Sequence, residues 1–174
     1  MQELILTTPS LAYAAQLLSY KQETLAIEPH INGVGGLDSF EDIALWLEFL
    51  HQKADETTCP PGFVPDSSWL CIRQSDNRLV GMINIRHRLN DWLLDYGGHI
   101  GYSVRPDERG KGYAKAQLRL ALDKCRALQL PRVLLTCDED NEASRRTILS
   151  CGGVYEDTRT KPDGERLQRY WITL

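Results

Sequence analysis

The sequence has 174 residues, near the usual size of one domain, so a single hydrophobic core is expected. Its 42% hydrophobic and 25% charged residues exclude a disordered, collagen-like or membrane-spanning chain. Twenty Lys and Arg against 24 Asp and Glu give a net charge of -4, which argues against bulk attraction to nucleic acid or membrane, so any anion site must be local.

The expected elements follow the order β α α β β β α β α β β. Strands are expected over residues 3–8, 69–74, 79–87, 99–104, 132–137, 154–159 and 167–173. Helices are expected over 11–26, 112–128 and 141–150. A further helix is expected to begin after the capping-box signal that Ser39 and Asp42 form. This order predicts a mixed α/β fold with one open, mostly antiparallel sheet of about six to seven strands and about four helices.

Two segments before the fourth expected strand are typical of a site. Residues 55–68 contain three prolines and a glycine without periodicity, so they form a long loop that we expect to lie over a site. In the run 79–87, Asn84 and Arg86 alternate with Ile83 and Ile85, as expected where one sheet face is partly wet or lines a cleft.

The cysteines indicate neither a disulfide framework nor a metal site. They are an odd number without a CxxC pair, so we expect reduced, mostly buried thiols and no metal. The five cysteines are Cys59, Cys71, Cys125, Cys137 and Cys151.

The first residues lack a basic region, and no apolar run approaches the length needed to span a membrane, so the cytoplasm is the expected location.

The informative stretch is 104–114, VRPDERGKGYA, between a strand and a long helix. Gly110 and Gly112 let the backbone turn and approach a ligand, and the first N–H groups of a helix are unpaired donors at its positive end. Between positions 105 and 119, five basic residues stand against two acidic ones. The turn therefore predicts a phosphate site, although it also fits an ordinary glycine turn before a solvated helix. Its spacing excludes a Walker A loop and a Rossmann fingerprint.

At this point the sequence resembles the GNAT superfamily of acyl-CoA-dependent N-acyltransferases. Residues 109–114, RGKGYA, match that family's Arg/Gln-x-x-Gly-x-Gly/Ala signature, after a Val-x-Pro lead-in at 104–106. Residues 141–153 are similar to the family's second motif, and the run from His99 to Tyr102 is similar to the Glu-Ile-Gly-Tyr of the branch that acetylates protein N-termini. The resemblance implies one GNAT-like domain over residues 1–174, splayed between strands four and five.

The resemblance also implies an acetyl-CoA site. Main-chain N–H at or next to Val104 would polarise the thioester, and Asn141 and Ser144 would lie near the pantetheine arm. Asn141 is equally suited to cap its helix. The residues implied to hold the diphosphate through their backbone N–H groups are Arg109, Gly110, Lys111, Gly112, Tyr113 and Ala114.

Direct transfer to an amine requires that the amine be neutral. Deprotonating a lysine-like amine at pH 7 costs roughly 4.6 kcal/mol, whereas a thiol leaving group needs about 2 kcal/mol of help. His99 is the first candidate base, although a strand histidine is often a packed structural residue. Tyr102 and Asp95 are alternatives, and Glu23 and Glu28 are weaker ones.

One position departs from the family's pattern. Many relatives place a general-acid Tyr seven residues after the motif Asn, and here Ile148 stands there. Tyr155 and Tyr170 on the last hairpin are less favoured substitutes. The departure leaves open a second function, a catalytically weak acyl-CoA-binding regulatory module, and a third, a general phosphate binder.

The expected acceptor is a primary amine of a small molecule or a peptide, with neither nucleic acid nor membrane as a partner. The resemblance implies that the two N-terminal helices and the 55–68 loop form its cleft, and that a homodimer can form. Trp46, Phe63 and Trp69 are candidate walls of the cleft. Three arginines, which could bind an acidic acceptor or be exposed strand residues, are Arg86, Arg88 and Arg105.

Overall fold

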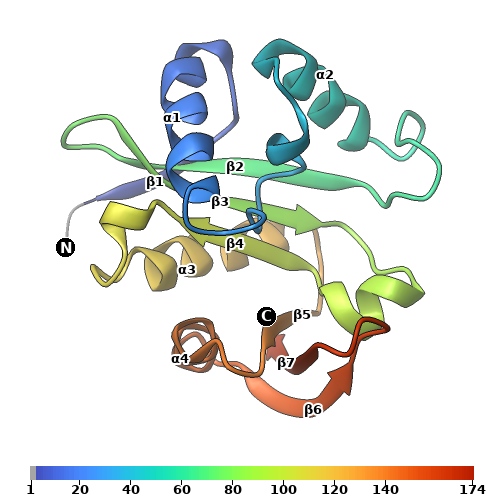
Figure 1. Cartoon of the computed structure of the whole chain (residues 1–174). Coiled ribbons are helices and arrows are strands. Elements are labelled where there is room, and N and C mark those ends of the chain that lie inside the picture. The colour runs from blue at the N-terminus through green and yellow to red at the C-terminus, as the bar shows by residue number, and fades with distance from the viewer. Residues whose placement is uncertain (1–2) are drawn as a thin grey trace.

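The computed structural model describes residues 3–174 and contains two antiparallel sheets that meet at one end (Figure 1). The first sheet has the order β1-β2-β3-β4, with β1 Leu4–Thr7, β2 Asp66–Arg73, β3 Arg78–Arg86 and β4 Ile100–Val104. The second has the order β5-β7-β6, with β5 Arg132–Asp138, β6 Val154–Thr160 and β7 Arg166–Thr173.

Helices cover both faces of the first sheet, as Figure 1 shows. The helices α1 (Ala14–Leu25) and α2 (Ile43–Lys53) pack on one face, around the fully buried Trp46 and Tyr20. The helix α3 (Tyr113–Ala127) packs on the other face, in a core that also takes in β5, β7 and Ile148 of α4 (Glu142–Ser150). Short 3-10 turns occur at Leu11–Tyr13, Leu37–Ser39 and Pro106–Glu108, and a π-helical turn at Leu93–Gly97.

The two sheets separate between β4 and β5. The N–H of His99 donates to the carbonyl of Leu134 at 2.7 Å, and the N–H of Leu134 donates to Nδ1 of His99 at 2.9 Å. Past this junction the strands belong to different sheets. Because Arg105 donates its N–H to Val80 of β3, alternation places the N–H groups of Tyr102 and Val104 on the opposite edge, facing the gap.

The structure confirms the predicted order of strands and helices and the splay between the fourth and fifth strands. Three details differ. The strand β2 begins at Asp66, three residues earlier than expected, because its polar first residues pair in register with the end of β3. Asp42 alone caps α2, accepting from Ala44 N–H at 2.7 Å, while Ser39 ends a 3-10 turn. The π-helical turn carries no apolar periodicity that would predict it.

Two further findings concern surfaces. Among residues 3–174, no helix has both the length and the apolar character needed to span a bilayer. The strand β6 lies at the open edge of its sheet, with Val154 and Tyr155 exposed. An edge of this kind can pair with a second copy, so the homodimer stays a prediction.

Candidate functional site

The turn between β4 and α3 is shaped by two glycines in the left-handed region. Gly110 has φ 76° and Gly112 has φ 85°, values that favour glycine because a Cβ there is strained. A Cβ built at either position has no atom within 4 Å. The turn is therefore strained for other residues yet open above, as a backbone that a ligand approaches closely would be.

The amides of this turn are free to bind a ligand. Within the described chain, the N–H groups of Gly110, Lys111 and Gly112 have no hydrogen-bond acceptor, and the N–H of Ala116 donates to the carbonyl of Gly112 at 3.1 Å. These donors stand at the positive end of a 15-residue helix. The geometry fits a diphosphate, which needs several convergent donors.

The charged side chains beside the turn are engaged by the protein. Arg109 donates through Nε to the carbonyl of Val104 at 3.1 Å, and its Nη2 lies 2.7 Å from a carboxylate oxygen of Glu28. Lys111 pairs with the buried Glu108 at 2.9 Å. Burial raises the pKa of Glu108, but hydrogen bonds from Lys111 and Arg73 outweigh this effect and lower it. The side chains of Arg109 and Lys111 therefore shape the turn.

The helix α4 reaches across the gap toward β4. The side chain of Asn141 accepts from the N–H of Ser144 at 3.0 Å, so Asn141 caps α4. The hydroxyl of Ser144 lies 2.8 Å from that of Tyr102. Burial raises the pKa of Tyr102 to about 12, so its phenol is protonated at neutral pH. Ile148 is fully buried in the core and does not face the gap.

His99 links the two sheets. Its Nδ1 accepts a backbone hydrogen bond, its ring meets Trp171 edge-on at 6.2 Å between centroids, and only 7% of the residue is exposed. Burial, and then the nearby charge of Arg86, lower the pKa of His99 to about 4. A group with this pKa is neutral at pH 7 but a weak base, since a general base works best with a pKa near the working pH.

The other expected bases are paired as well. Asp95 forms an ion pair with Arg159. A carboxylate oxygen of Glu23 lies 3.4 Å from Nε of Arg105, the residue that follows β4. The hydroxyls of the two hairpin tyrosines bond within their own sheet, Tyr155 to Thr158 at 2.9 Å and Tyr170 to Gln168 at 2.6 Å.

The role of His99 as a link gives a pH-dependent prediction. Between pH 6.5 and 4 the unfolded chain binds a proton at His99 that the folded chain does not, so stability falls as the pH falls through this window. The loss should reach about 3 kcal/mol. The variant His99→Asn keeps an acceptor for Leu134 and should lack this component, measured by urea unfolding at successive pH values. Equal pH profiles for the two proteins would contradict the prediction.

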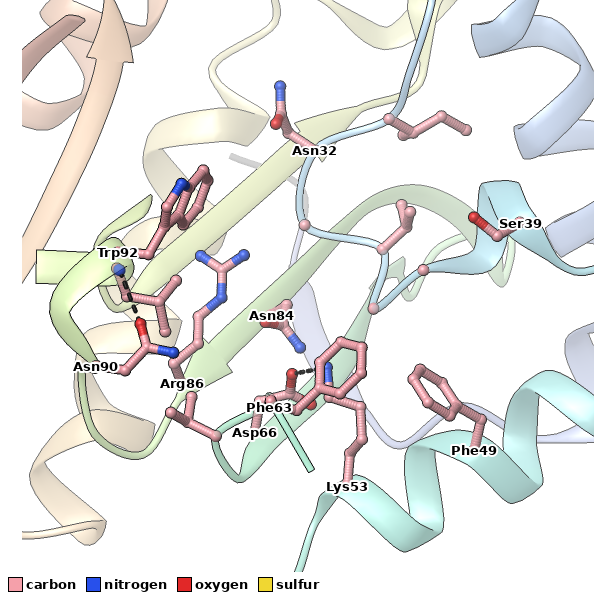
Figure 2. Close-up of a pocket in the computed structure, with 18 of the residues that line it drawn as sticks. Asn32, Ser39, Phe49, Lys53, Phe63, Asp66, Asn84, Arg86, Asn90 and Trp92 are labelled. Carbon is pink, nitrogen blue, oxygen red and sulfur yellow. Dashed lines mark hydrogen bonds and ion pairs between the residues drawn. The ribbon is translucent and has the colours of Figure 1, made fainter. Parts of the chain in front are cut away.

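A cavity of about 580 Å³ opens on the α1 and α2 side of the first sheet (Figure 2). Its walls come from the α1–α2 loop, the end of α2, the 62–64 segment, the ends of β2 and β3, and residues 90–93. Along this face of the sheet the paired side chains of β2 and β3 change from apolar to charged, in the order Leu70 with Met82, Ser68 with Asn84, and Asp66 with Arg86. As the alternation predicts, Asn84 and Arg86 line the cavity.

The aromatic walls differ in part from those expected. Phe63 lines the cavity, 51% exposed. Trp46 is wrong as a wall, because it is fully buried and its Nε1 donates to Gly35 at 3.3 Å. Trp69 is also wrong, because it packs beneath Lys124 of α3 on the opposite face of the sheet. Phe49 and Trp92 also line the cavity, and neither was expected there from the sequence. Only Trp92, which stands beside a polar run, has a sequence context that indicates a position outside the core.

The cavity adjoins β4 through the α1–α2 loop. A Cβ built on Gly33, which has φ +72°, would lie 2.3 Å from the carbonyl oxygen of Gly101 and 2.4 Å from Cα of Tyr102. The loop therefore rests directly on β4. Both features therefore adjoin β4. The turn over residues 110–112 lies beyond the end of this strand, and the cavity lies on one of its faces.

A family model described as an acetyltransferase (GNAT) domain matches residues 3–154. No curated protein sequence matches the chain. Among residues 3–174, no three or more His, Cys, Asp or Glu side chains are grouped so as to hold a metal ion.

Three solved structures share the fold at low sequence identity. A ribosomal-protein-alanine acetyltransferase from Vibrio fischeri has a TM-score of 0.71 and 15% identity, covering 99% of this chain and 94% of its own. A ribosomal-protein α-N-acetyltransferase in complex with coenzyme A has a TM-score of 0.70 and 15% identity, covering 100% and 96%. A spermidine/spermine N-acetyltransferase from Vibrio cholerae has a TM-score of 0.68 and 15% identity, covering 99% and 95%.

Proposed function

Because the chain belongs to the GNAT acetyltransferase family, we propose that it transfers an acetyl group from acetyl-CoA to a primary amine of a small molecule or a peptide. The observation that carries the proposal is the turn over residues 110–112, whose amides have no acceptor in the described chain and stand beside the gap between β4 and β5. One solved structure of the same fold holds coenzyme A, which supports this donor.

The donor is held by backbone groups in this proposal. The N–H groups of Gly110, Lys111 and Gly112 bind the diphosphate, and the left-handed glycines let the chain approach it. The N–H of Arg109, expected to join them, already donates to the carbonyl of Pro106 at 3.4 Å. The N–H groups of Tyr102 and Val104 face the gap, where they can polarise a thioester carbonyl. The fixed amide dipoles need no reorganisation during the reaction, which is why backbone donors suit this task.

Proton transfer follows from the groups that face the gap. The amine nitrogen attacks the carbonyl carbon, the new N–C bond replaces the C–S bond, nitrogen loses a proton and sulfur gains one. The protonated phenol of Tyr102, bonded to Ser144, is proposed to donate a hydrogen bond to the leaving sulfur, and the thiolate then takes its proton from solvent, because a phenol with a pKa of about 12 holds its proton more tightly than a thiol. His99 is a sheet link in this scheme, and the proton of an α-amine of pKa about 8 leaves through solvent at small cost.

The cavity beside β4 is the proposed acceptor site. It lies on the face of the sheet opposite Tyr102 and Ser144, so an amine entering from it approaches β4 from the α1 and α2 side. The neighbours of the same fold include enzymes named for ribosomal proteins and for spermidine, so the fold by itself does not select the amine.

The direct test is a thiol-release assay with acetyl-CoA and a panel of amino acids, their amides, polyamines and short peptides. At least one amine should raise free thiol well above the rate without acceptor. Tight coenzyme A binding with no product from any amine would instead favour the regulatory binding module. Stabilisation by ATP equal to that by coenzyme A would favour the general phosphate binder.

The same assay tests the hydrogen bond from the Tyr102 hydroxyl to sulfur. Because a thiol leaving group needs only about 2 kcal/mol of help, Tyr102→Phe should lower kcat by up to about 30-fold and leave KM for acetyl-CoA nearly unchanged. Tyr155→Phe, on a hydroxyl bonded within the last hairpin, is the matched control and should leave kcat unchanged.

A further inference from the structure

The cavity contains one guanidinium without a carboxylate partner. Arg86, the last residue of β3, extends between Asn84 and Trp92 toward Asn32 (Figure 2). Its Nη1 reaches the carbonyl oxygens of Gly97 and Gly98 at 3.4 and 3.5 Å, the long limit of a hydrogen bond. Arg86 takes part in no ion pair among residues 3–174, and Asp66, which faces it on β2, pairs with Lys53 instead.

The other charges around the cavity are balanced. Lys53 and Asp66, both buried, form an ion pair within the lining. Arg88, two residues beyond Arg86, points away to Glu56 at 2.7 Å on the exposed surface. The lining residues are otherwise uncharged, so the cavity keeps one uncompensated positive charge, at Arg86.

The guanidinium stays charged in this setting. Burial lowers the pKa of Arg86 and the charge of Asp66 raises it, but an arginine is not deprotonated in proteins. A partly buried charge with most of its five donors unused gains from an anion. The planar fork of the guanidinium matches a carboxylate in two parallel hydrogen bonds, which a single amide side chain cannot offer.

The position of Arg86 ties this anion site to the reaction. Its Nη1 lies 3.4 Å from the point where a Cβ on Gly101 would stand, so it sits beside β4. An anion bound there is held across the strand from the gap that receives the thioester in the proposed function. A molecule that fills both places carries its anionic group close to its amine.

We propose that the acceptor is a carboxylate-bearing amine, an amino acid or a close derivative, bound through its carboxylate by Arg86. The inference rests on the proposed function and names the substrate class of that site. It also predicts poor use of polyamines, because a second cation would enter a cavity that already carries a positive charge. The chain would then differ in acceptor from the spermidine/spermine enzyme whose fold it shares.

The test is a binding measurement that needs no turnover. N-acetylated amino acids, which are the expected products, and their matching amides are titrated by calorimetry into protein saturated with coenzyme A. For the amino acids that fit the cavity, the acid should bind about 10- to 100-fold more tightly than its amide. Arg86→Gln should reduce this ratio to near one. Arg88→Gln, the matched exposed arginine, should leave the ratio unchanged.

The outcomes separate the two proposals. Equal binding of acids and amides to the unaltered protein across the panel overturns the inference, even if other amines release thiol. Tighter binding of spermidine, or of N-acetylethanolamine phosphate, than of every N-acetylated amino acid also overturns it. Acid binding that depends on Arg86 without thiol release from any amino acid supports the inference and contradicts the proposed function. Melting curves of Arg86→Gln and Arg86→Lys show whether the variants are folded, and Arg86→Lys should keep part of the ratio.

Discussion

Replacing Gly112 by Glu should weaken coenzyme A binding by at least about 100-fold. The new side chain would start from the open Cβ position above the turn and place a negative charge where the diphosphate is expected. Two like charges about 4 Å apart near a protein surface repel by about 4 kcal/mol, and each 1.4 kcal/mol is a factor of ten in affinity. Calorimetric titration of coenzyme A measures the loss directly.

The control must separate this effect from backbone strain. Gly164, in the turn between β6 and β7, has φ +92° and also has no atom within 4 Å of an added Cβ. Gly164→Glu therefore carries a similar strain of about 1–2 kcal/mol, far from the α3 turn. It should lose stability as Gly112→Glu does and bind coenzyme A normally. If Gly112→Glu bound coenzyme A equally well, the donor site would be misplaced.

Gly33→Ala should lower the free energy of unfolding by about 2–5 kcal/mol. The added methyl would overlap the carbonyl oxygen of Gly101 and the Cα of Tyr102, and both are backbone atoms that cannot rotate away. The residue also has a left-handed φ of +72°. Because the α1–α2 loop forms a wall of the cavity, the variant should also raise KM for the acceptor.

A second glycine of the same loop provides the comparison. Gly36 has φ +86°, and its added Cβ would meet only Cε1 of Phe49, at 3.7 Å, an ordinary contact. Gly36→Ala should cost only the backbone strain, about 1–2 kcal/mol. Urea unfolding of the two variants gives a difference that measures how tightly the loop rests on β4. No difference between them would mean that the loop does not need this close packing.

Local features of the chain predicted the fold well. The order of elements depends on apolar spacing and on proline and glycine at element ends, which act within a few residues. The same is true of the glycine turn, where Gly110 and Gly112 were recognisable from their spacing and their place before a helix. For this reason the predicted strands and helices agree with the structure to within about three residues.

The candidate site shows where such reasoning stops. His99 stands on the expected strand, but its contact with Leu134, 35 positions away, makes it a link between sheets. Three arginines were equal candidates for an acidic acceptor. Only the folded chain pairs Arg88 with Glu56 and Arg105 with Glu23 and leaves Arg86 in the cavity without a carboxylate.

The sequence by itself determined the architecture, the family and the place of the glycine turn before α3, because each follows from a short pattern that carries its own geometry. The tertiary structure alone decided which side chains are buried, which charges are neutralised and which aromatic residues reach the cavity. These properties depend on partners brought together from distant parts of the chain, and the energies of charge and burial are set by those partners.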